Sequence, residues 1–497
     1  MSINEIIHEW ARTQPDRLAL TFPTKKRVYT YKKLEITTAT IGKQLSKKGI
    51  VPGNIVVLLF TDSEPLVLYL IALLRMNVYA MPIDLTMEED KAKDLIAFAA
   101  PACIIFSNGK ETLFSKIKNV QNYNQQKFNK GICILLNEAQ SEVYKDGATV
   151  LLPTSGTTGN PKIVQISQHS MILNSNQVCR FLGIGPKDIF LSVTPLVYCH
   201  GFYNGILLPV ISGAGTIVID RFDAFVAAKI WNTIKQYGIT VVNIVPIMLD
   251  MIMKIKYTES TQVNSLRFMI CGTANLQVEL KLNFTNKFNV PIYSQYGTTE
   301  ALINTINTAP DKHESVGQPI GGCEIVIQDS NGRQADVGEL GEITIKGGFV
   351  TRGYFKNAEL TAQLIHGNKL KTGDLGYFDK DGFLYISGRK KEIINKGGIK
   401  IFPDDINRIF RLHPSIAEVY TIGVQDNDYG EDIFTFVVPA KNSNVNAHML
   451  FEFARSKLSR NKIPRKIFIL ESIPKGPTGK FKIQDLKEIV LLKKACN

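Results

Sequence analysis

A short segment rich in glycine and hydroxyl side chains has the composition of a phosphate-binding loop. Residues 154–162 read Thr-Ser-Gly-Thr-Thr-Gly-Asn-Pro-Lys, from Thr154 to Lys162. Gly156 and Gly159 let backbone N–H groups approach phosphate oxygens without a Cβ in the way. Further donors come from three hydroxyls and one compact charge, on Ser155, Thr157, Thr158 and Lys162. The segment therefore suits a polyphosphate, although an ordinary polar turn has the same composition.

The flanks of this segment favour the phosphate-binding interpretation. Apolar runs at 150–152 and 163–166 are typical of short buried strands, so the glycines fall at the tip of a predicted hairpin. The segment is not a Walker loop, because no Gly-Lys-Ser/Thr triplet follows at the required spacing.

Two later segments place a carboxylate beside a tight turn. Residues 296–300 read Tyr-Gly-Thr-Thr-Glu, in which Glu300 can hold Mg²⁺ and Thr299 can donate to a phosphate oxygen. Residues 371–374 read Lys-Thr-Gly-Asp, and Asp374 after the predicted glycine turn can accept both hydroxyls of a ribose. Each segment taken alone also fits a polar turn or cap.

Three basic segments follow toward the C-terminus. In Gly-Arg-Lys-Lys-Glu at 388–392, Arg389 can support a ribose, and Lys-Gly-Gly at 396–398 can form a backbone edge for an extended ligand. Residues 474–480 form a loop that is stiff at first and then flexible, from which Lys480 can bring a cation into an active site. A solvated charge run, a plain turn and a surface lysine are the respective alternatives.

The elements that must position these residues follow an α/β pattern. Strands are predicted at 18–22 and 27–30, an amphipathic helix at 31–48 and a buried parallel strand at 54–60. This alternation favours a body of doubly wound sheets. From Val316 onward short alternating strands and turn dipeptides predict a small antiparallel β section, with strands at 324–328, 341–346 and 382–386.

Composition excludes several classes of protein. The chain has 497 residues, is 44% apolar, and its most apolar stretch is broken by Asp62 and Glu64, so we expect no membrane span. Seven scattered cysteines without a Cys-x-x-Cys pair predict a reducing cytoplasm and no zinc site. The net charge of +13 comes without any nucleic-acid-binding motif, so we expect no nucleic acid; anionic small substrates account for part of it.

Together and in this order, the six segments resemble the motifs of the adenylate-forming superfamily. This family includes acyl- and aryl-CoA synthetases, adenylation domains of nonribosomal peptide synthesis and beetle luciferases. The resemblance runs from residue 29 to Lys480. It implies a large N-terminal domain, 1–390, with its β-rich section at about 316–388, and a small mobile α+β lid, 391–497, that rotates at Lys391.

The resemblance also implies a role for each segment. The loop at 154–162 would hold the β- and γ-phosphates, Thr299 the α-phosphate, and Glu300 the Mg²⁺ ion. Asp374 and Arg389 would hold the ribose, and Lys480 the oxygens of the forming acyl-adenylate. The remaining nucleotide and thiol contacts would come from Gly272, Thr273, Ala274, Tyr296, Gly297 and Thr298, and from Gly397 and Gly398 along a thiol tunnel.

The resemblance places the acid pocket at residues 195–202, where the chain departs from its relatives. Tyr198 takes the place of a usual histidine, and His200 precedes a glycine. The implied pocket residues are Tyr198, Cys199, His200, Gly201 and Phe202, although His200 also fits a satisfied core histidine. No Asp or Glu lies in 195–205 to pair an ammonium group, so we expect an acid without an α-amine. Ile163 replaces a common glycine and should affect loop mobility.

The implied reaction is ATP-dependent activation of a carboxylic acid, followed by transfer to a phosphopantetheine thiol. Coenzyme A is the expected acceptor, because Gly397 and Gly398 offer a thiol tunnel. A loader that passes its adenylate to a carrier protein is the alternative. Two other hypotheses are a nucleotide-binding protein that no longer catalyses and a luciferase-like oxygenase. The first conflicts with the intact Lys162, Glu300 and Lys480, and nothing in the sequence favours the second.

Replacement of Lys480 by alanine tests the assignment. We expect Lys480→Ala to nearly abolish adenylation, measured by exchange of pyrophosphate into ATP, because the forming charge on the acyl-adenylate loses its cation. ATP binding should persist. Unchanged adenylation would contradict the assignment.

Overall fold

The computed structural model describes residues 1–107, 123–129, 131–137, 142–144, 149–154, 162–258, 260–426, 428–441, 443–476 and 481–495. The chain forms two compact units. The first unit comprises Met1–Ile325 and Ile345–Leu370, and the second comprises Val326–Thr344 and Lys371–Asn497. The predicted hinge at Lys391 falls within the second unit and stays a prediction.

A seven-stranded sheet in the first unit carries the glycine-rich segment. Its strand order is β6 (Tyr123–Asn129), β7 (Ile132–Asn137), β5 (Cys103–Ser107), β3 (Ile55–Leu59), β4 (Tyr79–Pro82), β8 (Thr149–Thr154) and β9 (Lys162–Ser167). Strand β3 is buried throughout and runs parallel to β4 and β5, as its continuous apolar run predicts. Strands β8 and β9 pair antiparallel with Thr154 opposite Lys162, which confirms the predicted hairpin.

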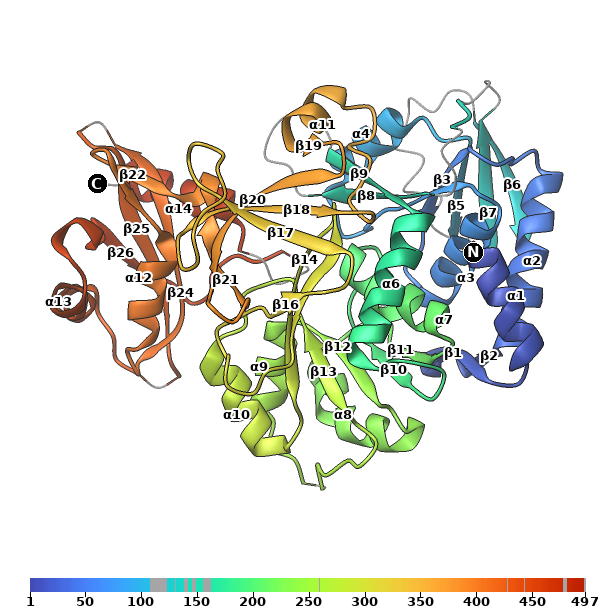
Figure 1. Cartoon of the computed structure of the whole chain (residues 1–497), viewed down its shortest axis with the longest axis horizontal. Coiled ribbons are helices and arrows are strands. Elements are labelled where there is room, and N and C mark those ends of the chain that lie inside the picture. The colour runs from blue at the N-terminus through green and yellow to red at the C-terminus, as the bar shows by residue number, and fades with distance from the viewer. Residues whose placement is uncertain are drawn as a thin grey trace. The chain divides into compact units, whose positions relative to one another are not determined.

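A nine-stranded sheet is the other large sheet of the first unit, and β1 and β2 near the N-terminus belong to it (Figure 1). Its order is β16 (Gln318–Pro319), β15 (Leu302–Asn307), β14 (Ile292–Thr298), β13 (Phe268–Cys271), β12 (Val241–Ile244), β10 (Ile189–Ser192), β11 (Gly215–Val218), β1 (Leu18–Phe22) and β2 (Arg27–Thr30). Strands β10, β12, β13 and β14 run parallel, so their carboxyl ends meet at one edge, where ligands bind in sheets of this kind.

Helices cover these sheets. They are α1 (Ile3–Thr13), α2 (Tyr31–Lys47), α3 (Ser63–Arg75), α4 (Glu89–Ala99), α6 (Gln168–Leu182), α7 (Leu208–Ser212), α8 (Ala224–Tyr237), α9 (Pro246–Lys254), α10 (Val278–Phe288) and α11 (Ala358–Leu364). Helices α8, α9 and α10 lie beside β12 and β13 (Figure 1). Trp231 of α8, Leu249 of α9 and Phe284 of α10 pack against residues of β12 and β13 in one apolar cluster. Among the described residues, no helix combines the length and apolarity needed to span a bilayer.

The predicted antiparallel β section is confirmed as a sheet of β17 (Cys323–Gln328), β18 (Gly341–Gly347), β20 (Lys369–Phe378), β19 (Ile365–His366) and β21 (Leu384–Arg389). Two local predictions are wrong. Residues 371–374 form no turn but lie inside β20, where Gly373 adopts φ of +72°. The strand predicted at 382–386 begins at Leu384 and continues to Arg389, so that Arg389 pairs with Asp374 across the ladder.

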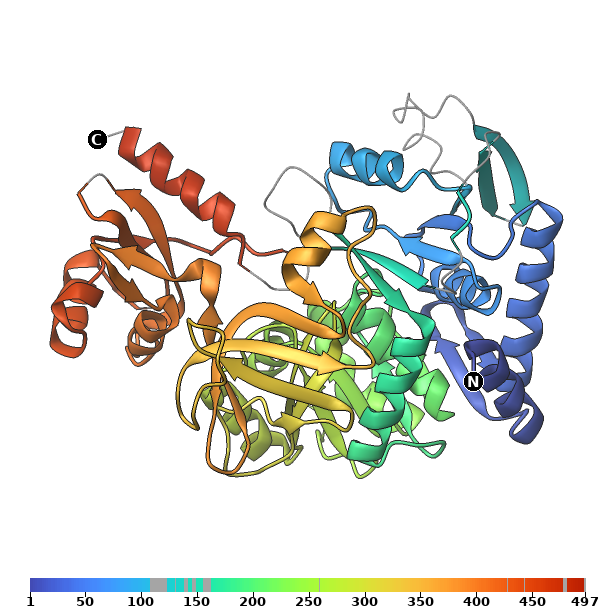
Figure 2. The ribbon, with the colours of Figure 1, turned by 45° about the horizontal axis from the view of Figure 1, so that its top comes forward.

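The rest of the second unit is a small α+β body (Figure 2). Its sheet contains β23 (Ile399–Ile401), β22 (Ile394–Lys396), β25 (Gly430–Pro439), β24 (Ile416–Asp426) and β26 (Lys466–Ile469). Helices α12 (Pro403–Arg411) and α13 (Ala447–Lys457) pack on the face that carries Ile433. Helix α14 (Ile483–Ala495) packs on the face that carries Phe434, because neighbouring strand residues point to opposite faces.

Candidate active site

The two ends of the glycine-rich segment are fixed by strand pairing. The hydroxyl of Thr154, at the end of β8, donates to the backbone carbonyl of Lys162, at the start of β9, over 3.3 Å. The predicted phosphate donors between them, Ser155, Gly156, Thr157, Thr158 and Gly159, lie outside the described residues, as does Lys480.

The predicted magnesium ligand lies in a tightly bonded turn after β14. That strand ends with Tyr296, Gly297 and Thr298, and the turn contains Thr299 and Glu300. The hydroxyl of Thr298 accepts the N–H of Ala301 over 3.0 Å, which closes the turn. Tyr354 Oη donates to Glu300 Oε1 over 2.7 Å, and the N–H of Thr351 donates to the Glu300 carbonyl over 2.6 Å.

The carboxylate of Glu300 fits a magnesium ion. Mg²⁺ prefers hard oxygen ligands and in proteins often takes one or two carboxylates together with substrate phosphates. Tyr354 occupies only Oε1 of Glu300, and no residue in the described part of the chain bonds Oε2. One oxygen is thus oriented and the other is available to a cation.

The segment predicted to flank adenine has an unusual backbone. Gly272, Thr273 and Ala274 follow β13, and Thr273 adopts φ of +72°, which is a genuine outlier for a β-branched residue. The Thr273 hydroxyl is buried without a hydrogen-bond partner in the described structure. A Cβ on Gly272 would lie 2.7 Å from Cγ of Gln295, so this position requires glycine. Such strain is a feature of ligand-binding sites.

A cluster of buried polar side chains surrounds His200, which begins a π-helix, His200–Leu207. The side-chain amides of Asn204 and Gln295 each approach His200 Nδ1 to 3.2 Å. With both amides oriented so that their nitrogens face the ring, Nδ1 accepts, and the proton of the neutral ring is assigned to Nε2. Nε2 is buried without a partner in the described part of the chain, as are Gln295 Oε1 and Asn243 Oδ1.

Burial sets the charge state of two predicted pocket residues. It lowers the pKa of His200 to about 4, so the ring is neutral at pH 7. Burial, with a smaller contribution from the charge of Glu300, raises the pKa of the Cys199 thiol to about 12. Cys199 is therefore a poor nucleophile, and His200 is a neutral donor through Nε2.

Tyr198 contacts a carboxylate that the sequence did not reveal. Its hydroxyl donates to Asp84, which also accepts the N–H and the hydroxyl of Thr86 over 2.8 Å each. The absence of acidic residues from 195–205 therefore does not make the surroundings of Tyr198 free of negative charge. Phe202 is fully buried and belongs to the core.

The second unit brings the two predicted ribose residues together. Nε of Arg389 lies 2.9 Å from Oδ1 of Asp374, and the two residues are paired across β20 and β21. Asp374 is only 5% exposed, so its ion pair with Arg389 offsets the cost of burying its charge. Lys391 lies in the short 3₁₀ helix Lys390–Glu392 that follows.

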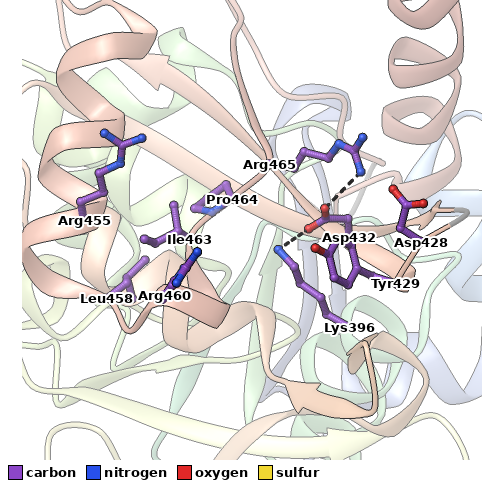
Figure 3. A pocket seen from close by; sticks show the side chains of 10 residues that line it. All are labelled: Lys396, Asp428, Tyr429, Asp432, Arg455, Leu458, Arg460, Ile463, Pro464 and Arg465. Atoms are coloured by element: carbon purple, nitrogen blue, oxygen red, sulfur yellow. Dashed lines mark hydrogen bonds and ion pairs between the residues drawn. The ribbon is translucent and has the colours of Figure 1, made fainter.

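A cavity of about 680 Å³ lies in the second unit beside the predicted thiol tunnel (Figure 3). Gly397 and Gly398, at the turn between β22 and β23, have φ of +58° and +83°. The N–H of Gly397 donates to the carbonyl of Tyr429, which lines the cavity, over 2.8 Å. The charged lining consists of Lys396, Arg455, Arg460 and Arg465 with Asp428 and Asp432.

The positive charge of this cavity is partly compensated. Lys396 Nζ lies 2.5 Å from Asp432 Oδ1, and Arg465 also reaches Asp432 (Figure 3). Arg465 pairs in addition with Asp426. Arg460 forms no ion pair within the described residues. Arg455 pairs with Glu452 and Arg465 with Asp426, neither of which lines the cavity, so among the described residues Arg460 is the lining cation that remains for an anionic ligand.

Comparison with known proteins gives matches over most of the chain. The family model of AMP-binding enzymes matches residues 7–355, and the model of the C-terminal domain of AMP-binding enzymes matches residues 405–480. The chain is 28% identical to an oxalate–CoA ligase of Arabidopsis thaliana, and the match covers 96% of both chains. It is 26% identical to a sulfoacetate–CoA ligase of Cupriavidus necator, over 95% of this chain and 94% of the relative.

The fold matches that of solved structures. ATP-bound MatB from Rhodopseudomonas palustris superposes with a TM-score of 0.88 at 22% identity, over 98% of this chain and 99% of that chain. This likeness confirms the predicted fold class.

The buried His200 predicts a pH dependence of stability. Between pH 6.5 and about 4 the unfolded ring is protonated while the folded ring is neutral, so the unfolded state binds more protons. Stability should therefore fall as the pH drops through this window. Both tryptophans, Trp10 and Trp231, lie in the first unit, so their fluorescence reports its unfolding in urea.

We expect the urea midpoint of the wild type to fall more between pH 7 and pH 5 than that of His200→Gln, which cannot titrate there. Other titrating groups are common to both proteins and cancel in the comparison. Equal losses in the two proteins would contradict the neutral buried state of His200.

Proposed function

Because the chain belongs to the AMP-binding enzyme family and is an AMP-forming acid–thiol ligase that uses ATP and Mg²⁺, we propose that it joins a short, oxygen-rich acid to coenzyme A. The acid carboxylate attacks the α-phosphorus of ATP, which gives an acyl-adenylate and releases pyrophosphate. The deprotonated thiol then attacks the acyl carbon and expels AMP. The first step joins two anions, so donors and cations must gather around the phosphates.

The proposed roles follow the chemistry of each side chain. Lys162 and the segment before it would bind the departing pyrophosphate, and Glu300 would hold Mg²⁺. Asp374 accepts the ribose hydroxyls and is itself held by Arg389. Mg²⁺ supplies a divalent charge that neutralises the phosphate oxygens. Thr299 donates to the α-phosphate, Thr273 and Tyr296 flank the adenine, and Lys480 binds the oxygens of the adenylate.

The observation that carries the choice of acid is the unpartnered Nε2 of His200. A buried N–H without an acceptor destabilises the site by its full desolvation free energy. A ligand that supplies an acceptor removes this cost. A second group with oxygens at the far end of the acid meets this need, whereas an alkyl or phenyl end does not. Oxalate and sulfoacetate, the acids in the names of the two relatives, both carry a second acidic group.

Pairs of acids that differ only in this second group test the proposal. Oxalate is matched by isobutyrate, malonate by 3-methylbutanoate, and sulfoacetate by 3,3-dimethylbutanoate. At least one oxygen-bearing acid should exceed its alkyl partner in kcat/KM by about 100-fold or more, measured as AMP release, because a site built to hydrogen-bond rejects the analogue that lacks the acceptor.

In His200→Leu this preference should shrink by about 10-fold or more, since the donor is gone. If every alkyl acid matches or exceeds its oxygen-bearing partner in the wild type, the proposed class of acid is wrong.

The acceptor half of the proposal rests on the cavity in the second unit. Coenzyme A carries a 3′-phosphate and a diphosphate besides its thiol, and arginine side chains bind phosphates with paired donors. Arg460 has no ion pair to give up within the described residues, so it is available to a phosphate. Tyr429, which lines the cavity, accepts a backbone hydrogen bond from Gly397 at the proposed thiol tunnel.

Dephospho-coenzyme A, which lacks the 3′-phosphate, separates phosphate binding from thiol chemistry. We expect Arg460→Ala to raise the KM for coenzyme A by about 3–10-fold, as the loss of one charge-assisted hydrogen bond predicts. In the same variant the KM values for coenzyme A and dephospho-coenzyme A should differ less than in the wild type. The rate of pyrophosphate exchange should be unchanged. Arg408→Ala, on α12 and away from the cavity lining, is the matched control.

A carrier protein in place of coenzyme A is the alternative acceptor. If a purified phosphopantetheinyl carrier is acylated with a higher kcat/KM than coenzyme A, and Arg460→Ala leaves the KM for coenzyme A unchanged, this half of the proposal fails.

We also propose a lid of residues 391–497 that turns at Lys391, and a reducing cytoplasmic setting. The six described cysteines are free, which is consistent with that setting.

A further inference from the structure

Residues 351–355 hold Glu300 through both its backbone and its side chain. Thr351 N–H donates to the Glu300 carbonyl over 2.6 Å, and Tyr354 Oη donates to its carboxylate over 2.7 Å. Tyr354 is only 5% exposed, and its hydroxyl reaches 54 residues back along the chain. A buried hydroxyl bonded to a single carboxylate oxygen restricts the orientation of that carboxylate.

The same residues pair with the free edge of β9. The N–H of Phe355 donates to the Ile163 carbonyl over 2.8 Å, and the N–H of Gln165 donates to the Gly353 carbonyl over 3.2 Å. Tyr354 faces Val164 in an antiparallel bridge. Residues 351–355 therefore form a strap that joins Glu300 to the strand whose first residue is Lys162.

Contacts with Thr361 and a further hydrogen bond to β9 also hold the strap in place. Gly353 has φ of +147°, and a Cβ there would lie 2.6 Å from Cγ2 of Thr361, so only glycine fits. The hydroxyl of Thr361 accepts the N–H of Tyr354 over 2.9 Å, and the hydroxyl of Thr351 donates to the Gln165 carbonyl over 2.5 Å. With its backbone fixed in this way, Tyr354 can place its hydroxyl accurately.

The phenol remains a donor under all working conditions. An ordinary phenol has a pKa of about 10 and is therefore protonated at neutral pH. A neutral phenol has one proton to give, which leaves the negative charge of Glu300 intact for a cation. A lysine or arginine at this position would instead neutralise it.

We propose that Tyr354 is a positioning residue for the metal: it fixes Glu300 so that one carboxylate oxygen faces Mg²⁺, and the strap keeps that oxygen in register with Lys162. This inference rests on the proposed function, in which Glu300 is the magnesium ligand. Partners that orient a metal ligand typically change metal affinity by about 10–100-fold when they are removed.

Metal affinity tests the inference directly. Mn²⁺ can replace Mg²⁺ as a spectroscopic probe, and its binding to the enzyme–ATP complex can be followed by electron paramagnetic resonance. We expect Tyr354→Phe, which removes only the hydroxyl, to weaken Mn²⁺ binding by about 10-fold. The Mg²⁺ concentration for half-maximal pyrophosphate exchange should rise by a similar factor, with kcat at saturating Mg²⁺ largely preserved.

Tyr29→Phe is the matched control. The Tyr29 hydroxyl also donates to a carboxylate, Glu64 Oε1, over 2.5 Å in the same unit, but has no part in the proposed site. This variant should leave Mn²⁺ binding unchanged. If Tyr354→Phe and Tyr29→Phe both bind Mn²⁺ like the wild type, the inference is overturned. It is also overturned if Tyr354→Phe loses ATP affinity without metal or shows a lower urea midpoint in proportion to its loss of Mn²⁺.

Glu300→Gln separates failure of this inference from failure of the proposed function. If Glu300→Gln weakens Mn²⁺ binding and Tyr354→Phe does not, Glu300 remains the ligand and only the positioning role is wrong. If Glu300→Gln binds Mn²⁺ like the wild type, the proposed ligand itself is wrong and the inference falls with it.

Discussion

Strand β9 is the element on which the residues proposed to bind phosphate and metal in the first unit depend. One of its edges pairs with β8 and the other with residues 351–355, and Ile163 and Val164 are fully buried between them. A buried strand must satisfy its backbone donors and acceptors on both edges, since each unpaired group costs a lost hydrogen bond. Meeting this requirement fixes the positions of Lys162 at the start of β9 and of Glu300 across the strap.

A second constraint concerns polar groups at the carboxyl ends of the parallel strands. Ser192 of β10, Asn243 of β12 and Gln295 of β14 each have a buried polar atom without a partner in the described structure. In a closed core such atoms are costly, because their desolvation is not compensated. Their concentration at one sheet edge, together with the positive φ of Thr273, is what a binding site is expected to show before its ligand arrives.

Local sequence patterns predicted the strands, the β8–β9 hairpin and the fold class, because periodicity and turn composition act over a few residues. They also identified Asp374 and Arg389, whose pairing the structure then revealed. Tyr354 and Asp84 were missed: they meet Glu300 and Tyr198 over 54 and 114 residues of chain. Such meetings depend on strand order and register, which a single sequence does not encode in any local signal. The turn predicted at 371–374 was wrong because Gly373 lies within β20, and the strand predicted from Gly382 begins later because Gly382 belongs to the preceding turn.

The side chains that orient the first-unit site share one property, which is that they are neutral. Tyr354 donates to Glu300, Tyr198 donates to Asp84, and Asn204 and Gln295 donate to His200. Neutral donors fix geometry without cancelling charge, so Glu300 keeps its attraction for a divalent cation. The two residues proposed to bind the ribose follow the opposite rule, because Arg389 pairs with Asp374 as a full charge. Ribose hydroxyls can donate to a carboxylate, so the proposed role of Asp374 depends on its acceptor oxygens rather than on its net charge.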